Sequence, residues 1–386
     1  MERRSFIRII GAGFAAATLN STLSHCTYSI DKVNYGWDGP SDSESDIRLK
    51  IIAYAILCPN PHNKQPWLIK LTSQLSLELY VDQTRLLPET DPFARQIHIA
   101  QGCFLETLSI AASGLGYQAD IEYFPRGEYS NVVIENQPVA RIILTPNTTI
   151  DEDSLFKYIL KRQSNKREYD NSRLFPSQKS QLKAALMSDK ATLTIHDFES
   201  ENIYLRELLT EAMTIESSDK TRNLETIKMF RFSDQEVEKY RDGFGLEHQG
   251  ISGIKKLIIE NLFLDREKTE KDPTNFGKQS VDITRSICES CSSFAWIVTE
   301  GNSRLQQVNV GRDYCRLNLT TTAMGLAQHP MSQILQEYQD MMPLQKKFKQ
   351  HFNIEAGKTV QMLVRLGKST KTAHTPRRLV NNLLID

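Results

Sequence analysis

The chain has 386 residues, and its 47 lysines and arginines balance 47 aspartates and glutamates, so the formal net charge is zero. This length is ample for a large buried core, and 40% hydrophobic residues indicate a globular protein rather than a disordered or fibrous one. The absence of any run of eighteen apolar residues argues against a polytopic membrane protein, and the neutral charge gives no sign of nucleic-acid binding.

The first 26 residues have the anatomy of an export signal. Arg3 and Arg4 precede a short, mildly apolar run at 9–19 that is rich in glycine and alanine. A basic segment before a short apolar one is typical of signal peptides, and the paired arginines resemble the twin-arginine (Tat) motif. The alternative is an amphipathic first helix of the folded protein, which the glycines disfavour.

Cys26 closes a Leu-Ser-His-Cys sequence that has the outline of a lipobox, although His25 is atypical in that position. We therefore expect export by the Tat machinery to the periplasm or cell envelope. The signal is then either cut by an ordinary signal peptidase or leaves a membrane anchor at Cys26. Because Tat cargo is exported folded and often carries a cofactor, the resemblance also favours a bound cofactor.

Further along the chain, two segments 211 positions apart share a pattern. Residues 97–116 and 308–327 both have apolar residues at helical spacing, and a Gly-Leu or Gly-Leu-Ala stop follows each periodic run. Runs typical of β-strands precede them at 75–81 and 294–298 and follow them at 139–144 and 360–364. The sequence therefore predicts one strand–helix–strand unit used twice; the alternative is two unrelated amphipathic helices.

The two halves differ by one long segment. Residues 199–290 are charged, mostly helical in pattern and without a counterpart in the first half, so we expect an inserted helical arm or cap. The predicted organisation is a signal at 1–26, a first repeat at 45–150 and a second repeat at 151–386 that contains the insert.

The cysteines give no metal site. Cys288 and Cys291 have CxxC spacing, but a structural zinc site needs a second ligand pair and none is visible. We interpret them as small buried residues of a helical stretch, and we predict no disulfide framework.

Two motifs carry a family resemblance. Residues 58–67 read Cys-Pro-Asn-Pro-His-Asn-Lys-Gln-Pro-Trp, and residues 162–170 read Arg-Gln-Ser-Asn-Lys-Arg-Glu-Tyr-Asp. Together they resemble the flavin-dependent nitroreductase superfamily, in which a Pro-Ser-x-x-Asn-x-Gln-Pro-Trp loop and an Arg-x-Ser-x-Lys/Arg segment enclose FMN between two subunits. A doubled unit behind a signal is similar to the Acg-type nitroreductase-like flavoproteins. The resemblance covers about residues 45–386, apart from the insert.

The resemblance implies an α+β, nitroreductase-like fold in which the two fused repeats form an intrachain pseudo-dimer. Each motif occurs once and in a different repeat, which implies one FMN per chain at the pseudo-dimer interface. The cofactor-binding residues that the resemblance implies are Pro59, Asn60, Asn63, Gln65, Arg162, Ser164, Lys166, Pro330, Arg377 and Arg378.

Cations in this set would offset the charge of the flavin phosphate, and arginine would do so with bidentate geometry. Asn60 and Asn63 would pair with the ring edge or the ribityl chain, and Trp67 would pack beneath the loop. The alternatives are a solvated basic cluster at 162–166 and a plain basic tail at 377–378. His62 is either ligand-facing or a loop histidine whose hydrogen bonds are satisfied within the protein, and we favour the second.

The function that follows is an exported FMN oxidoreductase. In the family a donor such as NAD(P)H reduces the flavin, which then reduces a nitroaromatic, a quinone or a similar acceptor, and no side chain has to act as a nucleophile. The alternative is a non-catalytic flavin-binding or sequestering protein, because NAD(P)H is scarce outside the cytoplasm and the insert would be able to cover the flavin. A carbohydrate- or peptide-binding module remains open only if no flavin binds.

Overall fold

The structure is a computed structural model that describes residues 36–386. The predicted signal at 1–26 and the predicted anchor at Cys26 lie outside the described residues.

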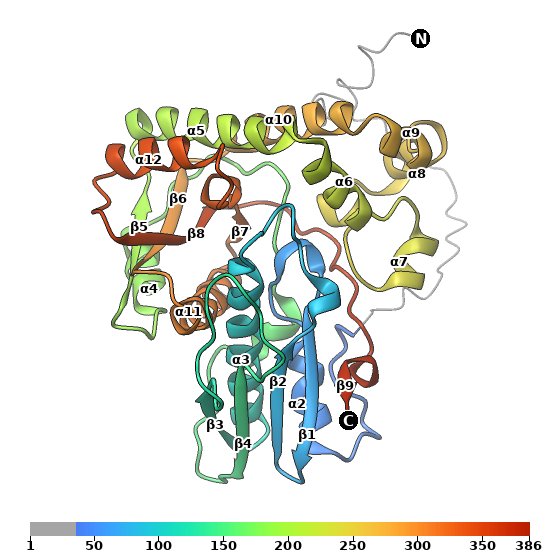
Figure 1. Cartoon of the computed structure of the whole chain (residues 1–386), viewed down its shortest axis with the longest axis vertical. Helices are drawn as coiled ribbons and strands as arrows, with labels where there is room; N and C mark the ends of the chain where they lie inside the picture. The colour runs from blue at the N-terminus through green and yellow to red at the C-terminus, as the bar shows by residue number, and fades with distance from the viewer. Residues whose placement is uncertain (1–35) are drawn as a thin grey trace, which may run out of the picture.

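Two β-sheets form the framework (Figure 1). The first sheet has the order β3-β4-β2-β1-β9, with β1 at Trp67–Ser73, β2 at Ser76–Val81, β3 at Tyr117–Tyr123, β4 at Ala140–Pro146 and β9 at Leu384–Ile385. The second has the order β5-β6-β8-β7, with β5 at Ala191–His196, β6 at Ser293–Glu300, β7 at Ala327–Pro330 and β8 at Lys358–Gly367. Neighbouring strands are antiparallel except β1 and β9, which are parallel.

Helices lie between and around the sheets. Those of the framework are α2 at Ile47–Ala55, α3 at Arg95–Gly114, α4 at Pro176–Ala184, α11 at Arg304–Ala323 and α12 at Met342–His351. Those between β5 and β6 are α5 at Glu199–Ser218, α6 at Lys220–Met229, α7 at Asp234–Tyr240, α8 at Gly253–Leu262, α9 at Arg266–Lys271 and α10 at Pro273–Glu289. The prediction of an α+β protein is confirmed, and the segment predicted as an insert, 199–290, contains six α-helices.

The order of elements is the same in both halves. The first half runs α2-β1-β2-α3-β3-β4, and the second runs α4-β5-β6-α11-β7-β8 once the inserted helices are left out. The strand orders β3-β4-β2-β1 and β7-β8-β6-β5 correspond one to one. The sequence pattern missed β3 and β7, which stand between each long helix and the strand predicted to follow it.

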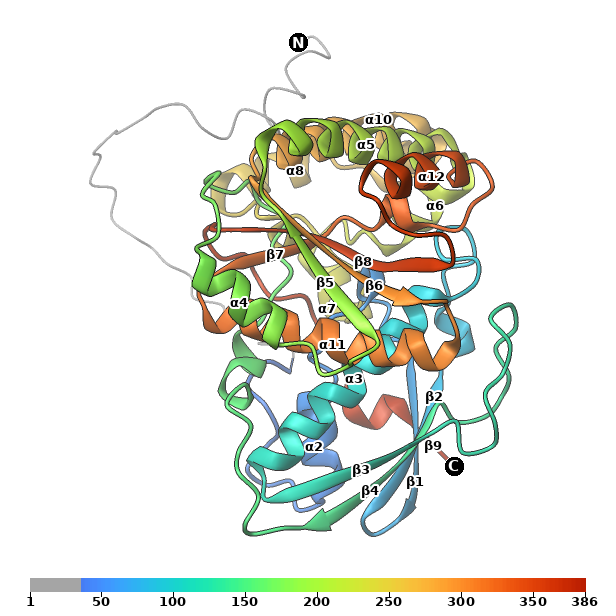
Figure 2. The same ribbon diagram turned by 90° about the vertical axis from the view of Figure 1, so that its left-hand side faces the viewer.

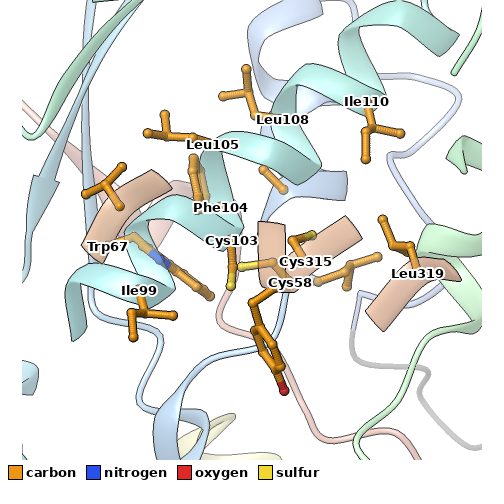
Figure 3. Close-up of a cluster of buried hydrophobic side chains, with 14 of the residues drawn as sticks. Cys58, Trp67, Ile99, Cys103, Phe104, Leu105, Leu108, Ile110, Cys315 and Leu319 are labelled. Atoms are coloured by element: carbon orange, nitrogen blue, oxygen red, sulfur yellow. The ribbon is translucent and has the colours of Figure 1, made fainter. Parts of the chain in front are cut away.

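The long helices α3 and α11 cross in the middle of the molecule, between the two sheets (Figure 2). Both have 20 residues, and they start 209 positions apart, at Arg95 and Arg304. The 211-position match in the sequence is therefore two residues out of register with the helix starts. Side chains from both helices and from the 58–66 region form one buried cluster, which contains Cys58, Cys103 and Cys315 (Figure 3).

The inserted helices cover one side of the second sheet and then extend toward the first half. Helices α5 and α10 pack together along the top of the molecule in Figure 1, and α6 and α7 lie near the end of the first sheet. The C-terminal tail returns to the first half, where β9 joins β1 through Ile69 and Leu384. Both segments of the second half thus lie against the first.

Three further observations concern membrane-spanning helices, metal-binding clusters and cysteines. Within residues 36–386, no helix is long and apolar enough to cross a bilayer. The same residues contain no group of three or more His, Cys, Asp or Glu side chains arranged to hold a metal ion. The five cysteines described are free and buried.

Candidate functional site

The loop at 58–66 joins α2 to β1 and has an unusual backbone. His62, Asn63 and Gln65 have φ values of 49°, 53° and 51°, in the left-handed region that residues other than glycine seldom adopt. Each such residue costs on the order of 1–3 kcal/mol and persists only where surrounding contacts fix it. The 58–66 loop is therefore a conformation that its neighbours must maintain.

Asn63 is buried, and its side chain joins three segments. Its Nδ2 donates to the carbonyl oxygen of Gly243 in the insert at 3.0 Å and to that of Pro376 in the C-terminal tail at 2.9 Å. Its Oδ1 accepts from Nη1 of Arg377 at 2.9 Å. The motif asparagine thus joins the loop, the insert and the tail.

Gln65 and Asn60 also use their amides within the protein. Nε2 of Gln65 donates to the carbonyl of Arg241 at 2.8 Å, and its Oε1 accepts from the backbone N–H of Arg378 at 2.7 Å. Oδ1 of Asn60 accepts from the backbone N–H of Gln65 at 2.8 Å, which closes the loop on itself. Pro59 is buried at the start of this turn. These contacts explain why the loop needs amide side chains.

Arg162 is only 3% exposed and bridges the two halves. Its Nε donates to Oδ1 of Asn318 on α11 at 2.6 Å, and its Nη1 donates to the carbonyl of Leu57 at 2.6 Å. Burial lowers the pKa of its guanidinium below the usual range. The contact between Arg162 and Asn318 cannot be predicted from the sequence, because the two residues lie 156 positions apart and no motif links them.

Arg377 approaches the same place from the tail and is 2% exposed. Its guanidinium donates to the carbonyls of Ile56 at 2.6 Å and Leu57 at 3.3 Å. Burial, with repulsion from Arg162, lowers the pKa of Arg377 to about 9. Both arginines therefore bind carbonyls just beyond the end of α2, where the helix dipole favours positive charge. A plain basic tail is wrong for Arg377.

Trp37 covers this arginine pair. Its ring centre lies 5.7 Å from Cζ of Arg162 and 4.9 Å from Cζ of Arg377, within the range of a cation–π contact. The indole stacks on His374 at 4.0 Å and donates from Nε1 to the carbonyl of Thr375 at 2.8 Å. No sequence motif connects Trp37 with this site.

Among the cations predicted to bind the cofactor, Lys166 differs from the three arginines. Within the described residues it forms no hydrogen bond to a backbone carbonyl and no ion pair with a carboxylate. Its Nζ lies 4.1 Å from the ring centre of Phe244 in the insert. Burial lowers the pKa of Lys166 to about 8, and no carboxylate of residues 36–386 contributes to that shift. An anion beside this ammonium would be stabilised by it.

His62 faces the same space. Its ring meets that of Phe244 edge to face at 6.1 Å, and burial together with the charge of Lys166 lowers the pKa of His62 to about 3. The imidazole is therefore neutral. Its Nδ1 is buried without a hydrogen-bond partner among the described residues, so the prediction of an internally satisfied histidine is wrong.

The remaining predicted residues lie around this centre. Ser164 is half-buried between Arg162 and Lys166 in the chain, and Pro330 ends β7 next to His329, whose pKa burial and neighbouring cations hold well below its usual value. Nη1 of Arg378 pairs with Oδ2 of Asp82 at 3.3 Å, so this arginine is partly neutralised.

The unpartnered buried groups suit a polar, anionic ligand. Nδ2 of Asn318, Nε of Arg167 and Nδ1 of His62 are buried and lack hydrogen-bond partners among residues 36–386. Together with the ammonium of Lys166 they offer hydrogen-bond donors and acceptors that the described residues leave unused. A flavin mononucleotide, with its phosphate and polar ring edge, has groups of the required chemistry.

The insert closes over this region. Phe244 lies against both Lys166 and His62, and a Cβ added to Gly250 would come within 2.5 Å of Cγ of Arg167. The insert therefore contacts residues of both motifs, as expected if it covers the candidate site.

No protein-family model matches the chain. An uncharacterized protein of Mycobacterium tuberculosis is 22% identical to it over 347 residues, which cover 86% of this chain and 91% of that protein. A second protein of that organism, provisionally described as an NAD(P)H nitroreductase, is 33% identical over 75 residues, 19% of this chain and 22% of that protein.

Among solved structures, an FMN-dependent nitroreductase from Mycobacterium smegmatis in complex with NADPH is 14% identical, covers 58% of this chain and 94% of its own, and has a TM-score of 0.37. A nitroreductase with bound FMN from Bacteroides fragilis is 12% identical, covers 56% and 89%, and has a TM-score of 0.33.

Proposed function

We propose that the chain is an exported, FMN-binding protein of the nitroreductase type, with oxidoreductase activity toward nitroaromatic, quinone or similar acceptors. The 58–66 motif, the 162–166 motif and the partial similarity to an NAD(P)H nitroreductase of M. tuberculosis support this assignment. Export through the Tat pathway, with or without an anchor at Cys26, is part of the proposal and rests on the sequence of residues 1–26.

One observation carries the proposal. Lys166, a half-buried ammonium with no carboxylate partner among residues 36–386, lies beside the strained 58–66 loop, and the two come from different halves of the chain. A buried cation without a counter-ion is costly unless a ligand supplies the opposite charge. This arrangement is the one expected if a single anionic cofactor binds between the halves.

The proposed division into repeats at 45–150 and 151–386 treats the two halves as an intrachain pseudo-dimer. The matching strand orders and the central crossing of α3 and α11 support it. Because each motif survives in one half only, the proposal expects one FMN per chain.

When bound, FMN would supply hydride acceptance and donation, and NAD(P)H is the proposed donor class. The side chains have binding tasks. Lys166 and Ser164 would hold the anionic group, and Asn318 and Arg167 would donate to polar atoms of the ligand. Arg162, Arg377 and the amides of the 58–66 loop would fix the walls, and Phe244 would exclude water.

The test is purification of the folded full-length chain, reconstitution with FMN, and steady-state consumption of NADPH with a nitroaromatic acceptor. Saturable FMN binding and acceptor-dependent NADPH consumption are expected. A chain that takes up no FMN would refute the binding assignment, and tight FMN without turnover for any donor would refute the enzyme assignment alone.

A second candidate is retention of FMN without turnover. The observation that favours it is the position of Phe244, which contacts both Lys166 and His62 and would therefore restrict the approach of an acceptor to a ligand held there. In that case FMN would bind tightly and a chemical reductant would reduce it. Nitroaromatic acceptors would then reoxidise the bound flavin no faster than it is reoxidised without an acceptor.

A further inference from the structure

We infer that Asp242 is a positioning residue: it fixes the insert segment 241–243 against the 58–66 loop, so that docking of the insert and the ligand-binding shape of the loop are coupled. The part of this inference that concerns FMN rests on the proposed function, whereas the coupling of the two segments stands without it.

Asp242 is 8% exposed and lies between two arginines from different parts of the fold. Its Oδ2 accepts from Nη1 of Arg85, in the first half, at 2.9 Å. Its Oδ1 pairs with Nη2 of Arg231, in the insert. The same Nη1 of Arg85 donates to the carbonyl of Lys64 at 3.0 Å. One carboxylate therefore ties the insert to a side chain that also holds the loop.

The neighbours of Asp242 on either side bind the loop directly. The backbone N–H of Gly243 donates to the carbonyl of Asn63 at 3.3 Å, and Nδ2 of Asn63 donates back to the carbonyl of Gly243 at 3.0 Å. Nε2 of Gln65 donates to the carbonyl of Arg241 at 2.8 Å. Segment 241–243 thus meets both amide side chains of the Asn-x-Gln-Pro-Trp motif.

The contacts with segment 241–243 help to maintain the strained backbone of the 58–66 loop. Asn63 and Gln65 are two of the three left-handed residues of the loop, and a strained backbone persists only where its contacts over-determine it. Segment 241–243 supplies such contacts from outside the first half. If it is released, the loop loses hydrogen bonds that oppose relaxation, and its ligand-facing shape becomes one of several.

Space around the segment is tight, which makes its register specific. Gly243 has a φ of 65°, and a Cβ there would fall 2.1 Å from the carbonyl oxygen of Met229. Only glycine therefore allows the chain to pass between Met229 and the loop in this conformation. Segment 241–243 is therefore held in one conformation by its neighbours.

The insert has a second attachment that serves as a matched control. In α6, Nη1 of Arg222 pairs with Oδ2 of Asp340 at 2.8 Å, and Nη2 pairs with Oδ1 at 3.0 Å. This bridge also ties the insert to the body through one carboxylate, but neither of its two side chains hydrogen-bonds to the 58–66 loop. Loosening it tests whether any weakening of the insert has the same effect.

The experiment compares Asp242→Asn and Asp340→Asn in the full chain. Hydrogen exchange of peptides that cover 58–66 and 241–250 is measured without ligand, and the FMN dissociation rate is measured by stopped-flow flavin fluorescence. We expect Asp242→Asn to raise exchange in both peptides together and to speed FMN release about tenfold, as for loss of one charge-assisted contact. Asp340→Asn is expected to leave both quantities at the wild-type value.

Equal effects of the two substitutions, or exchange that rises at 241–250 but not at 58–66, would overturn the coupling. If Asp242→Asn does not fold, Arg85→Lys, which keeps the charge but removes the guanidinium Nη1 that donates to both Lys64 and Asp242, replaces it with the same expected pattern. A wild-type chain that binds no FMN would refute the proposed function while the exchange data still decide on the coupling.

Discussion

Gly102 of α3 and Gly311 of α11 lie back to back where the two helices cross. A Cβ on Gly102 would come within 1.8 Å of the carbonyl oxygen of Val308, and one on Gly311 within 2.0 Å of that of Ile99. The contacts are reciprocal at a separation of 209 positions, the same as that of the helix starts. This crossing fixes the distance between the halves and hence the space between their motifs.

Replacing either glycine by alanine is therefore expected to destabilise the protein. The obstacle is backbone oxygen, which cannot move aside as a side chain tip can, so Gly311→Ala should cost about 3 kcal/mol or more of unfolding free energy. Chemical denaturation measures this. Ser109→Ala, a half-buried position of α3, is the control and should change stability by less than about 1 kcal/mol. Equal stability of the two variants would contradict the crossing.

Lys166 and Arg377 should separate ligand binding from structure. Lys166→Met removes a half-buried charge that has no carboxylate partner among residues 36–386, so we expect FMN affinity to fall about 10- to 100-fold while the melting temperature stays equal or rises. Arg377→Met removes donors from the carbonyls of Ile56 and Leu57, so we expect a lower melting temperature even without FMN. Isothermal titration and thermal unfolding of both variants check this. A Lys166→Met protein with unchanged FMN affinity would refute the role of Lys166.

The pH dependence of FMN affinity follows from the same lysine. Its pKa in the ligand-free protein is lowered to about 8, and an adjacent anion favours the charged form. Binding above about pH 8 therefore requires proton uptake, so affinity should be full below that pH and fall by up to about tenfold per unit above it. Dissociation constants measured across this range, in wild type and Lys166→Met, test the point. A variant with the same pH profile as wild type would exclude Lys166 as the titrating group.

Glu216 should make the free energy of unfolding depend on pH below neutrality. Burial raises the pKa of this α5 carboxyl to about 7, against the hydrogen bond from Tyr338 and the charge of Arg222, from a reference of 4.5. A raised carboxyl pKa favours the protonated folded state, so stability is lost as pH rises from about 4.5 to about 7, by about 3 kcal/mol at most. Denaturation of wild type and Glu216→Gln at both ends of this window isolates the contribution, because the difference between them should change with pH. A constant difference would refute it.

Patterns of local origin could be predicted from the sequence. Periodicity located α3, α11 and the strands β2 and β6, because apolar spacing is set by each element's own buried face. Trp67 was expected beneath the loop, and its ring is fully buried against Phe104. The lack of a counterpart for 199–290 was also visible as a break in the pattern.

The roles of individual site residues could not be predicted, because they depend on partners far along the chain. The side-chain amides of Asn63 and Gln65, which the resemblance assigns to FMN binding, donate to the carbonyls of Gly243, Pro376 and Arg241. These partners are carbonyl groups, which every residue has, so no sequence signal identifies them. The two-residue error in the repeat register is visible from the starts of α3 and α11 and from the reciprocal contacts of Gly102 and Gly311.

The central claim is that two halves of one chain enclose a single FMN. Equilibrium titration of the purified full-length chain with FMN, followed by quenching of flavin fluorescence and by absorbance of the separated complex, tests it most directly. The account predicts saturation at one FMN per chain. No saturable binding, or saturation at two per chain, would contradict it.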